Sequence, residues 1–255
     1  MTKYPIILVH GIILKDIKFI KAFGKIEKHL NSLGNACYTS KTDGFGTISN
    51  NAEMLKNQID QILLENNTTK VNLICHSKGG LDAKYLINEL NYGSKIASYI
   101  TLNIPHKGSI LADKILTLPR FITKILSWYL NFIYKIFGDK KPESYRVCLE
   151  LTKEAQDNTL LLNRDNIFCM SFSSTMSKSK DDYLFTIPFK AFNYFEDDKN
   201  DGAVSLESQK YINYQGNIDN ISHREITGFF VKKKNKEKVF KFYEYLAKEL
   251  EKNNL

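Results

Sequence analysis

Residues 71–81 read VNLICHSKGGL, in which an apolar run ends at a serine that stands among small residues. The run from Val71 to Cys75 predicts a buried strand, and residues 81–90 have apolar side chains at helical spacing. A serine at a sharp turn between a strand and a helix has a strained backbone, so its neighbours must be small. The pattern therefore predicts a nucleophile elbow at Ser77, with the first amides of the helix facing the reacting oxygen.

Strand and helix patterns alternate along the chain. Such alternation predicts an α/β fold whose mostly parallel sheet carries helices on both faces. Because neither a linker-like segment nor an internal repeat interrupts the pattern, residues 1–255 are expected to form a single domain. The expected strands cover residues 6–9, 36–39, 71–75, 96–102 and 167–172. The expected helices cover residues 17–33, 49–64 (with Ser49 as N-cap), 81–90 and 236–252.

A helical insertion is expected at about residues 108–165. Within it, residues 118–137 form a helical pattern that is apolar except for one narrow polar stripe. Two interpretations stay open: an ordinary buried helix, and a lid over an acyl-binding groove that also touches a lipid interface. The cations along this segment argue against a transmembrane span. The candidate lid and substrate-contacting residues are Phe121, Ile125, Trp128, Tyr129 and Phe132.

A serine hydroxyl becomes a nucleophile only when a base accepts its proton and a carboxylate orients that base. On folds with this elbow the acid follows the serine and the histidine comes last. Among the five histidines, only His223 follows the candidate acids, whereas His76 is expected to point away from Ser77. The remaining three are expected to be structural or exposed: His10, His29 and His106.

Chain order alone leaves several acids open. Asp201 stands out because the turn sequence Asn200-Asp201-Gly202 can direct a carboxylate inward from a loop. The other candidates resemble solvated loop charges. They are Asp181, Asp182, Glu196, Asp197, Asp198, Glu207 and Asp219.

Two backbone amides are expected to stabilise the negative charge that develops on the substrate oxygen. One is the amide of Lys78, directly after the nucleophile. The other is the amide of Ile12, because Gly11 at the end of the first strand allows a close approach of the backbone. Since these donors belong to the backbone, the side chains at both positions are expected to be partly free.

The net charge of +8 has two interpretations. Scattered lysines are typical of a solvated surface, and they also fit attraction to anionic lipid surfaces. Nucleic-acid binding is not expected, because the one dense run, residues 232–236, belongs at the solvated start of the last helix. The 43% hydrophobic content predicts a real core.

The four cysteines show neither metal-ligand spacing nor a disulfide framework, so buried free thiols are expected. Residues 1–5 lead into a strand without a signal-peptide pattern. A cytoplasmic protein is therefore expected, or a secreted one if a leader has been removed.

Five segments together resemble the bacterial triacylglycerol lipases of the Pseudomonas, Burkholderia and Bacillus kind, within the α/β-hydrolase superfamily. The resemblance implies an α/β-hydrolase fold and a catalytic triad of Ser77, Asp201 and His223. It also implies an oxyanion hole made by the amides of Ile12 and Lys78. Residues 110–165 do not resemble this family closely, so the shape of the lid stays open. The matching segments are ILVHG (7–11), KVNLI (70–74), HSKGGLD (76–82), PHKGS (105–109) and NDGAV (200–204).

The resemblance further implies a reaction, the hydrolysis of lipid or other hydrophobic esters through an acyl-serine, with no required cofactor. Three alternatives stay open: a short-chain carboxylesterase, an acyltransferase with the same triad, and a non-catalytic scaffold that binds a lipid or a partner protein. Many relatives hold calcium with an aspartate two positions after the histidine. Here Glu225 stands at that position, and Asp181 is the second candidate ligand.

Overall fold

The computed structural model describes residues 1–12, 21–159, 161–163, 165–187, 189–190 and 199–255. Six strands form one sheet in the order β2-β1-β3-β4-β5-β6, and all neighbouring strands run parallel. The predicted α/β class is therefore confirmed. The strands are β1 (Ile6–Val9), β2 (Cys37–Thr39), β3 (Val71–His76), β4 (Ile96–Leu102), β5 (Phe168–Thr175) and β6 (Tyr214–Asp219).

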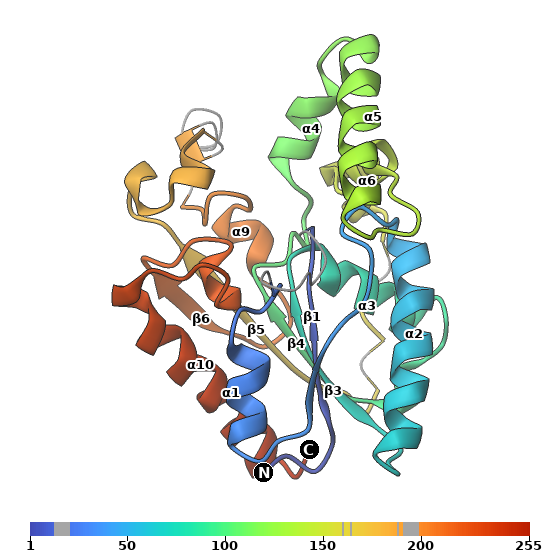
Figure 1. The fold of residues 1–255 in the computed structure, drawn as a ribbon, viewed down its shortest axis with the longest axis vertical. Coiled ribbons are helices and arrows are strands. Elements are labelled where there is room, and N and C mark those ends of the chain that lie inside the picture. Colours follow the sequence, from blue (N-terminus) through green and yellow to red (C-terminus); the bar gives the residue numbers. More distant parts are fainter. Residues whose placement is uncertain (13–20, 160, 164, 188, 191–198) are drawn as a thin grey trace.

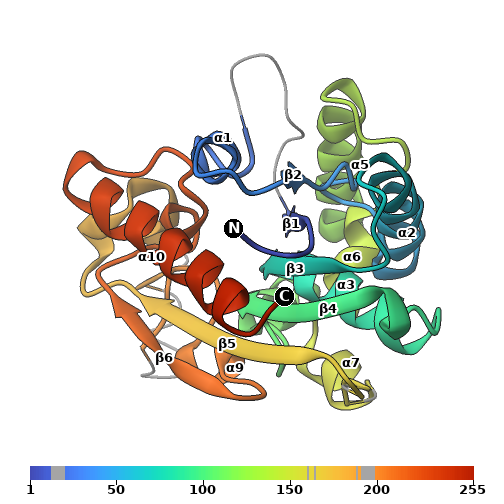
Figure 2. The same cartoon turned by 90° about the horizontal axis from the view of Figure 1, so that it is seen from below.

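Helices cover both faces of the sheet, as Figures 1 and 2 show. One face is covered by α1 (Ile26–Ser32) and α10 (Lys233–Lys252), and the other by α2 (Ile48–Glu65) and α3 (Lys78–Asn88). Because both faces are covered, β1, β3 and β4 are buried along their whole length. The further helices are α4 (Ile110–Leu116), α5 (Arg120–Ile136), α6 (Ser144–Glu150), α7 (Lys153–Asp157) and α9 (Leu206–Gln209).

Each face of the sheet has its own apolar core. In β1, Ile7 and Val9 belong to the core that includes residues of α2 and α3, whereas Ile6 and Leu8 belong to the core formed with α1 and α10. Successive side chains of a strand point to opposite faces, which produces this division. The central strand β3 lies between β1 and β4. The chain therefore enters the predicted elbow from a fully buried strand inside the sheet.

The first helix differs from its prediction. It begins at Ile26 and not at residue 17; residues 13–20 lie outside the described part of the chain. The turn before it includes Gly24, whose φ of +51° is easy only for glycine. A Cβ at this position would also lie 2.2 Å from the carbonyl oxygen of Gly228. The close approach of these two glycines therefore fixes where α1 starts.

Two smaller features were also predicted incorrectly or missed. Thr47, and not Ser49, is the N-cap of α2, because its hydroxyl accepts a hydrogen bond from the amide of Asn50. The edge strand β6 was not predicted, since its sequence YQGNID is only partly buried and lacks an apolar run.

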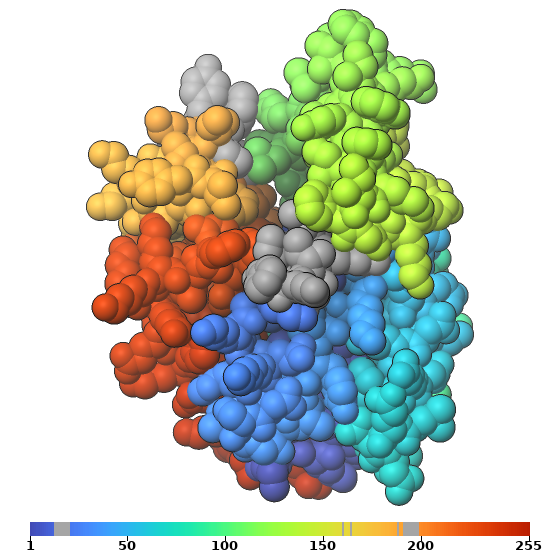
Figure 3. Space-filling view, viewed as in Figure 1, coloured from blue at the N-terminus to red at the C-terminus, as the bar shows by residue number. Residues whose placement is uncertain are grey.

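The helical insertion lies between β4 and β5 and stands above the carboxyl ends of the strands (Figure 1). Figure 3 shows α5 in green as a ridge that projects from the rest of the molecule. Among the helices formed by the described residues, none has both the length and the apolarity that crossing a membrane requires. The assignment of the whole chain to a single domain stays a prediction.

Candidate active site

The turn between β3 and α3 holds Ser77 in a strained conformation, with φ of 53° and ψ of −138°. Small neighbours are required there. A Cβ on Gly79 would lie 2.3 Å from the carbonyl oxygen of His10, and a Cβ on Gly11 would lie 2.7 Å from the Cβ of Ser77. The glycines of the elbow thus let the first strand pass directly beside the serine, as the sequence pattern predicted.

The structure brings Ser77, His223 and Asp201 together in one chain of hydrogen bonds. Nε2 of His223 lies 2.9 Å from Oγ of Ser77, and Nδ1 lies 2.7 Å from Oδ2 of Asp201. The Asp201 side chain is fully buried, and its other oxygen accepts hydrogen bonds of 2.8 Å from the amides of Ala203 and Val204. These donors stabilise the ionised carboxylate, so it can orient the imidazole without being exposed to water.

The backbone of His223 is held on both sides. Its amide donates to the carbonyl oxygen of Asp201 at 2.9 Å, and its own carbonyl accepts from Nε2 of His76 at 2.8 Å. The His76 side chain thus supports the backbone of the base, a role that the sequence did not indicate. Burial, and then the nearby His223, keep the pKa of His76 well below its ordinary value of 6.5. A neutral His76 with its proton on Nε2 suits this donor role.

The side chain of Lys78 is not free, contrary to expectation. It is 1% exposed, and its ammonium forms an ion pair of 2.7 Å with Asp82 one turn later in α3. The other oxygen of Asp82 accepts a hydrogen bond from Asn51 at 3.0 Å. Burial raises the pKa of Asp82 to about 6, although the Lys78 ammonium opposes this. The pair therefore ties the first turn of α3, whose Lys78 amide is the predicted oxyanion donor, to α2.

The second predicted oxyanion donor, Ile12, lines a cavity of about 320 Å³. Both Ser77 and His223 line this cavity, whose remaining walls are mostly apolar. Another hollow, of about 370 Å³, lies next to α3 and α7 and contains none of the three site residues. The apolar lining of the first cavity includes Leu111, Ala112, Ile115, Leu126, Leu130, Val147, Cys148, Leu151 and Val204.

The side of α5 that faces this cavity is not the side that carries the five predicted substrate-contacting residues. It contributes Thr123, Leu126, Ser127 and Leu130 to the lining. Its polar stripe is divided. The Asn131 side chain accepts a hydrogen bond from the Ser144 amide of α6 at 2.8 Å, whereas Arg120, Lys124 and Lys135 are exposed. The five predicted substrate-contacting residues do not line the cavity and lie on the outer face with exposed fractions of 55–69%. They are Phe121, Ile125, Trp128, Tyr129 and Phe132.

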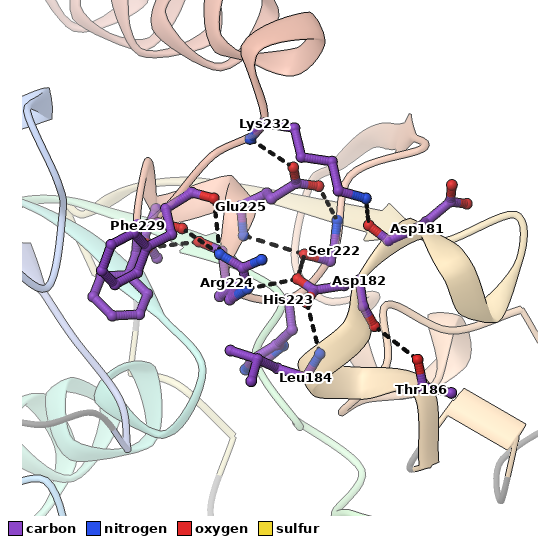
Figure 4. A network of polar contacts seen from close by, with 12 residues as sticks. Asp181, Asp182, Leu184, Thr186, Ser222, His223, Arg224, Glu225, Phe229 and Lys232 are labelled. Carbon is purple, nitrogen blue, oxygen red and sulfur yellow. Dashed lines mark hydrogen bonds and ion pairs between the residues drawn. The ribbon is translucent and has the colours of Figure 1, made fainter.

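The two candidate calcium ligands do not converge. The Asp181 carboxylate accepts from the amides of Ser177 and Lys178, and it points away from Glu225 (Figure 4). The Glu225 carboxylate accepts from the Lys232 amide at 2.9 Å. Among the residues that the structure describes, no group of three His, Cys, Asp or Glu side chains could hold a metal ion. The residues present therefore do not fit a calcium ion at this place.

Comparison with known proteins assigns the chain to a family. The family model for palmitoyl protein thioesterase matches residues 5–225. The chain belongs to the palmitoyl protein thioesterase family. It is also similar to triacylglycerol lipase 2 of Saccharomyces cerevisiae, with 28% identity over 79% of this chain and 60% of the yeast protein. Triacylglycerol lipase of Burkholderia plantarii is 36% identical over 44% of this chain and 32% of the relative. The chain thus spans less than two thirds of either relative.

The fold of this thioesterase-family chain is shared with solved lipase structures. The Staphylococcus hyicus lipase superposes with a TM-score of 0.77 at 16% identity, covering 99% of this chain and 97% of that one. The α/β-hydrolase fold is therefore confirmed, and so is the resemblance to lipases, although no particular subfamily is specified.

The buried histidine His106 stacks on an aromatic ring, which the sequence did not predict. His106 lies parallel to the ring of Tyr211 with 3.8 Å between ring centroids. Its ring nitrogens are buried and have no hydrogen-bond partner among the described residues, so the expected structural hydrogen bonds of this ring are not found. Burial, and then the charge of Lys84, hold the pKa of His106 well below 6.5. By contrast, His10 hydrogen-bonds the carbonyl of Gly11 at 2.9 Å, as expected of a structural histidine.

Replacing Asp82 with alanine should destabilise the protein by about 3–5 kcal/mol, because the Lys78 ammonium would stay buried without a counter-charge. Urea unfolding followed by circular dichroism measures this loss. Asp60→Ala is the matched control, since its ion pair with Lys95 is about half exposed and should contribute little. Equal losses in the two variants would contradict the prediction.

His106→Phe should change how stability depends on pH. Below pH 6.5, the ordinary pKa of histidine, the unfolded chain takes up a proton that the folded chain cannot, so stability falls with falling pH. Phenylalanine keeps the stack on Tyr211 and removes this proton. The free energy of unfolding should then fall less steeply from pH 6.5 to about pH 5, by up to about 1.4 kcal/mol per pH unit. Identical slopes in urea unfolding would show that His106 is not buried in its neutral form.

Proposed function

We propose that this chain hydrolyses carboxylic esters of hydrophobic acyl groups through a covalent acyl-serine. The observation that carries the proposal is the chain of hydrogen bonds from Ser77 through His223 to Asp201, set at the wall of an apolar cavity. Nucleophile, base and orienting acid all come from the chain itself, and we propose that no cofactor takes part. The similarity to triacylglycerol lipases supports the choice of lipid esters.

In the first half of the reaction, Oγ of Ser77 attacks the ester carbonyl while Nε2 of His223 accepts the hydroxyl proton. The Asp201 carboxylate keeps the other proton on Nδ1 and stabilises the imidazolium that forms. The amides of Ile12 and Lys78 are the proposed donors to the negatively charged oxygen, and losing one such donor costs about 3–4 kcal/mol of barrier. His223 then returns its proton to the leaving alcohol.

In the second half, water attacks the acyl-serine with His223 again as base. The acyl chain lies in the apolar cavity between α4, α5 and α6 during both halves, which places hydrocarbon against hydrocarbon. One wall of the cavity includes Cys148, and burial raises the pKa of this thiol to about 11. The thiol therefore stays protonated and serves as apolar surface, not as a second nucleophile.

The family assignment favours a second leaving group, a thiolate, because the matching family model is described as palmitoyl protein thioesterase. An oxygen ester and a thioester of the same acid form the same acyl-serine, so only turnover on matched substrates separates them. A panel of both ester types from acetyl to palmitoyl decides the leaving group and the chain length. Preference for acetyl esters would indicate a short-chain carboxylesterase, and acyl transfer to an added alcohol would indicate an acyltransferase.

Ser77→Ala should lower kcat for p-nitrophenyl octanoate by about 10⁴–10⁶-fold, because the nucleophile is removed. A fluorophosphonate probe should label the wild-type serine and leave the variant unlabelled. The variant is expected to fold, since Ser77 makes its side-chain contact only with His223 among the described residues. Full hydrolysis by a folded variant would refute the assignment, and an unlabelled, inactive wild type would indicate a non-catalytic scaffold.

We further propose that the outer face of α5 contacts the lipid surface that contains the substrate. An apolar patch of this kind is unusual on a protein that meets only water. Trp128 and Phe132 stack on each other with 6.0 Å between ring centroids and are 69% and 55% exposed. Arg120, Lys124 and Lys135 lie on the same helix. Their charges favour an anionic surface.

Replacing Trp128 and Phe132 together by serine should weaken binding to vesicles of phosphatidylcholine and phosphatidylglycerol by about 10–100-fold, because two aromatic side chains are no longer buried in lipid. Co-sedimentation measures the binding. Hydrolysis of a water-soluble ester should stay unchanged, since neither residue lines the cavity. Leu64→Ser, which removes an 83% exposed side chain from α2, is the control. Equal binding by all proteins would rule out this contact.

A further inference from the structure

The loop that carries His223 is held by two cationic side chains beside the two candidate calcium ligands, Asp181 and Glu225. We propose that Arg224 and Lys232 take over the positioning of this loop, so that His223 reaches Ser77 without a metal. The inference rests on the proposed function. It follows from the contacts of Ser222, Arg224, Glu225 and Lys232, which Figure 4 shows, and from the failure of Asp181 and Glu225 to form a metal site.

The carboxylate of Asp182 holds both chain neighbours of His223. Its Oδ2 accepts a hydrogen bond of 2.6 Å from the hydroxyl of Ser222 and lies 2.7 Å from Nε of Arg224. Asp182 is fully buried, whereas the Arg224 side chain is 16% exposed. A carboxylate without exposure needs a partner cation or several donors, and here the guanidinium of Arg224, the hydroxyl of Ser222 and the amide of Leu184 supply them. Ser222 and Arg224 directly precede and follow His223. Their contacts with Asp182 therefore fix the backbone position from which the imidazole extends.

The same guanidinium also closes the loop beyond the histidine. Nη1 of Arg224 donates to the carbonyl oxygens of Phe229 at 3.2 Å and Phe230 at 2.8 Å. Phe230 has a left-handed backbone with φ of 43°, an unfavourable conformation for a bulky residue. Arg224 thus joins a buried carboxylate to two backbone carbonyls. A cation with several oxygen ligands could make the same connection.

Lys232 makes the second connection. Its ammonium donates to the carbonyl oxygen of Asp181, and its amide donates to the Glu225 carboxylate at 2.9 Å. The second oxygen of Glu225 accepts from Nδ2 of Asn235 at 3.1 Å. The sequence predicted a solvated lysine run at residues 232–236. Its first residue, Lys232, instead hydrogen-bonds to the loop.

The oxygens that a calcium ion would need are already used. Calcium takes six to eight oxygen ligands at about 2.3–2.6 Å. In this loop both Glu225 oxygens, one Asp182 oxygen and the carbonyl of Asp181 each face a donor of the protein. An ion bound at these oxygens would compete with the Lys232 ammonium and with these amide and hydroxyl donors. The side chains of Arg224 and Lys232 supply positive charge next to these oxygens.

The first test compares the full-length protein with excess EDTA and with millimolar calcium. Both kcat/KM and the melting temperature should be the same in the two solutions. A loss of activity on chelation that calcium restores, or a melting temperature that calcium raises, would overturn the proposal, because a ligand that binds the folded state stabilises it. The melting temperature reports on calcium even if the wild type hydrolyses no ester, so failure of the proposed function is recognised separately.

The second test asks whether the Arg224–Asp182 contact positions the histidine. Arg224→Leu and Asp182→Asn should each lower kcat by about 10–100-fold, the range seen when a partner that orients a functional histidine is lost. KM should stay near the wild-type value, since neither residue lines the cavity. The double variant should lose less than the product of the two single losses, because the Arg224–Asp182 contact is removed in both. Arg224→Lys, which keeps the charge, should have an intermediate kcat.

Folding must be controlled in the second test. Asp60→Asn breaks an ion pair far from the loop and should keep wild-type kcat. The activity of each variant is measured below its own melting temperature. The rate is then divided by the concentration of enzyme that a fluorophosphonate probe labels after prolonged reaction, which gives kcat per active site. Unchanged kcat per labelled site in Arg224→Leu would show that the contact serves stability alone. Independent, additive losses in the double variant would equally overturn the coupling of the two residues.

Discussion

The hydrogen bond between Ser77 and His223 is the interaction on which the rest of the site depends. The two residues are 146 positions apart and meet at 2.9 Å. They meet because every neighbouring pair of strands is parallel, so the loops that follow β3, β5 and β6 all leave the same edge of the sheet. The strained backbone of Ser77 and the full burial of Asp201 are tolerated because the surrounding loops hold both in place.

The floor of the site is rigid for an electrostatic reason. Three buried carboxylates surround the nucleophile and its base, and each has a specific cationic or imidazole partner: Asp82 with Lys78, Asp182 with Arg224, and Asp201 with His223. Buried charges of this kind tolerate little displacement, because moving one partner leaves the other without compensation. The roof differs. In α5 only Thr123 is buried, so few contacts hold this helix over the cavity.

The sequence was informative where a local rule determines the structure. The elbow at Ser77 follows from a strand, small residues and a helix in succession, and chain order identifies His223. Order and turn chemistry only favoured Asp201 among many acids, and the resemblance to lipases was needed to prefer it. The partners of His76 and Lys78 were not predictable. The partner of His76 lies 147 positions away. Lys78 and Asp82 are four residues apart on a helix, where such pairs are usually exposed, and nothing local shows that this one is buried.

The orientation of α5 illustrates a different limit. A periodic pattern shows that a helix has an apolar and a polar side, but it does not say which side faces the protein. The usual assumption, apolar side inward, holds only in part here, because Leu126 and Leu130 line the cavity while Asn131 hydrogen-bonds to α6 and the aromatic residues lie outside. Of the two interpretations left open by the sequence, a buried helix and a lid, only the lid allowed part of the apolar side to face a lipid interface.

The order of the strands has a consequence for biosynthesis. The serine lies in the first third of the chain, whereas the strands β5 and β6 that position its acid and its base form one edge of the sheet and come late in translation. A ribosome-bound chain can therefore assemble β1 to β4 and the elbow before the histidine has been synthesised. Such an intermediate has a hydroxyl without a base, so the serine cannot act as an activated nucleophile until the last edge of the sheet docks.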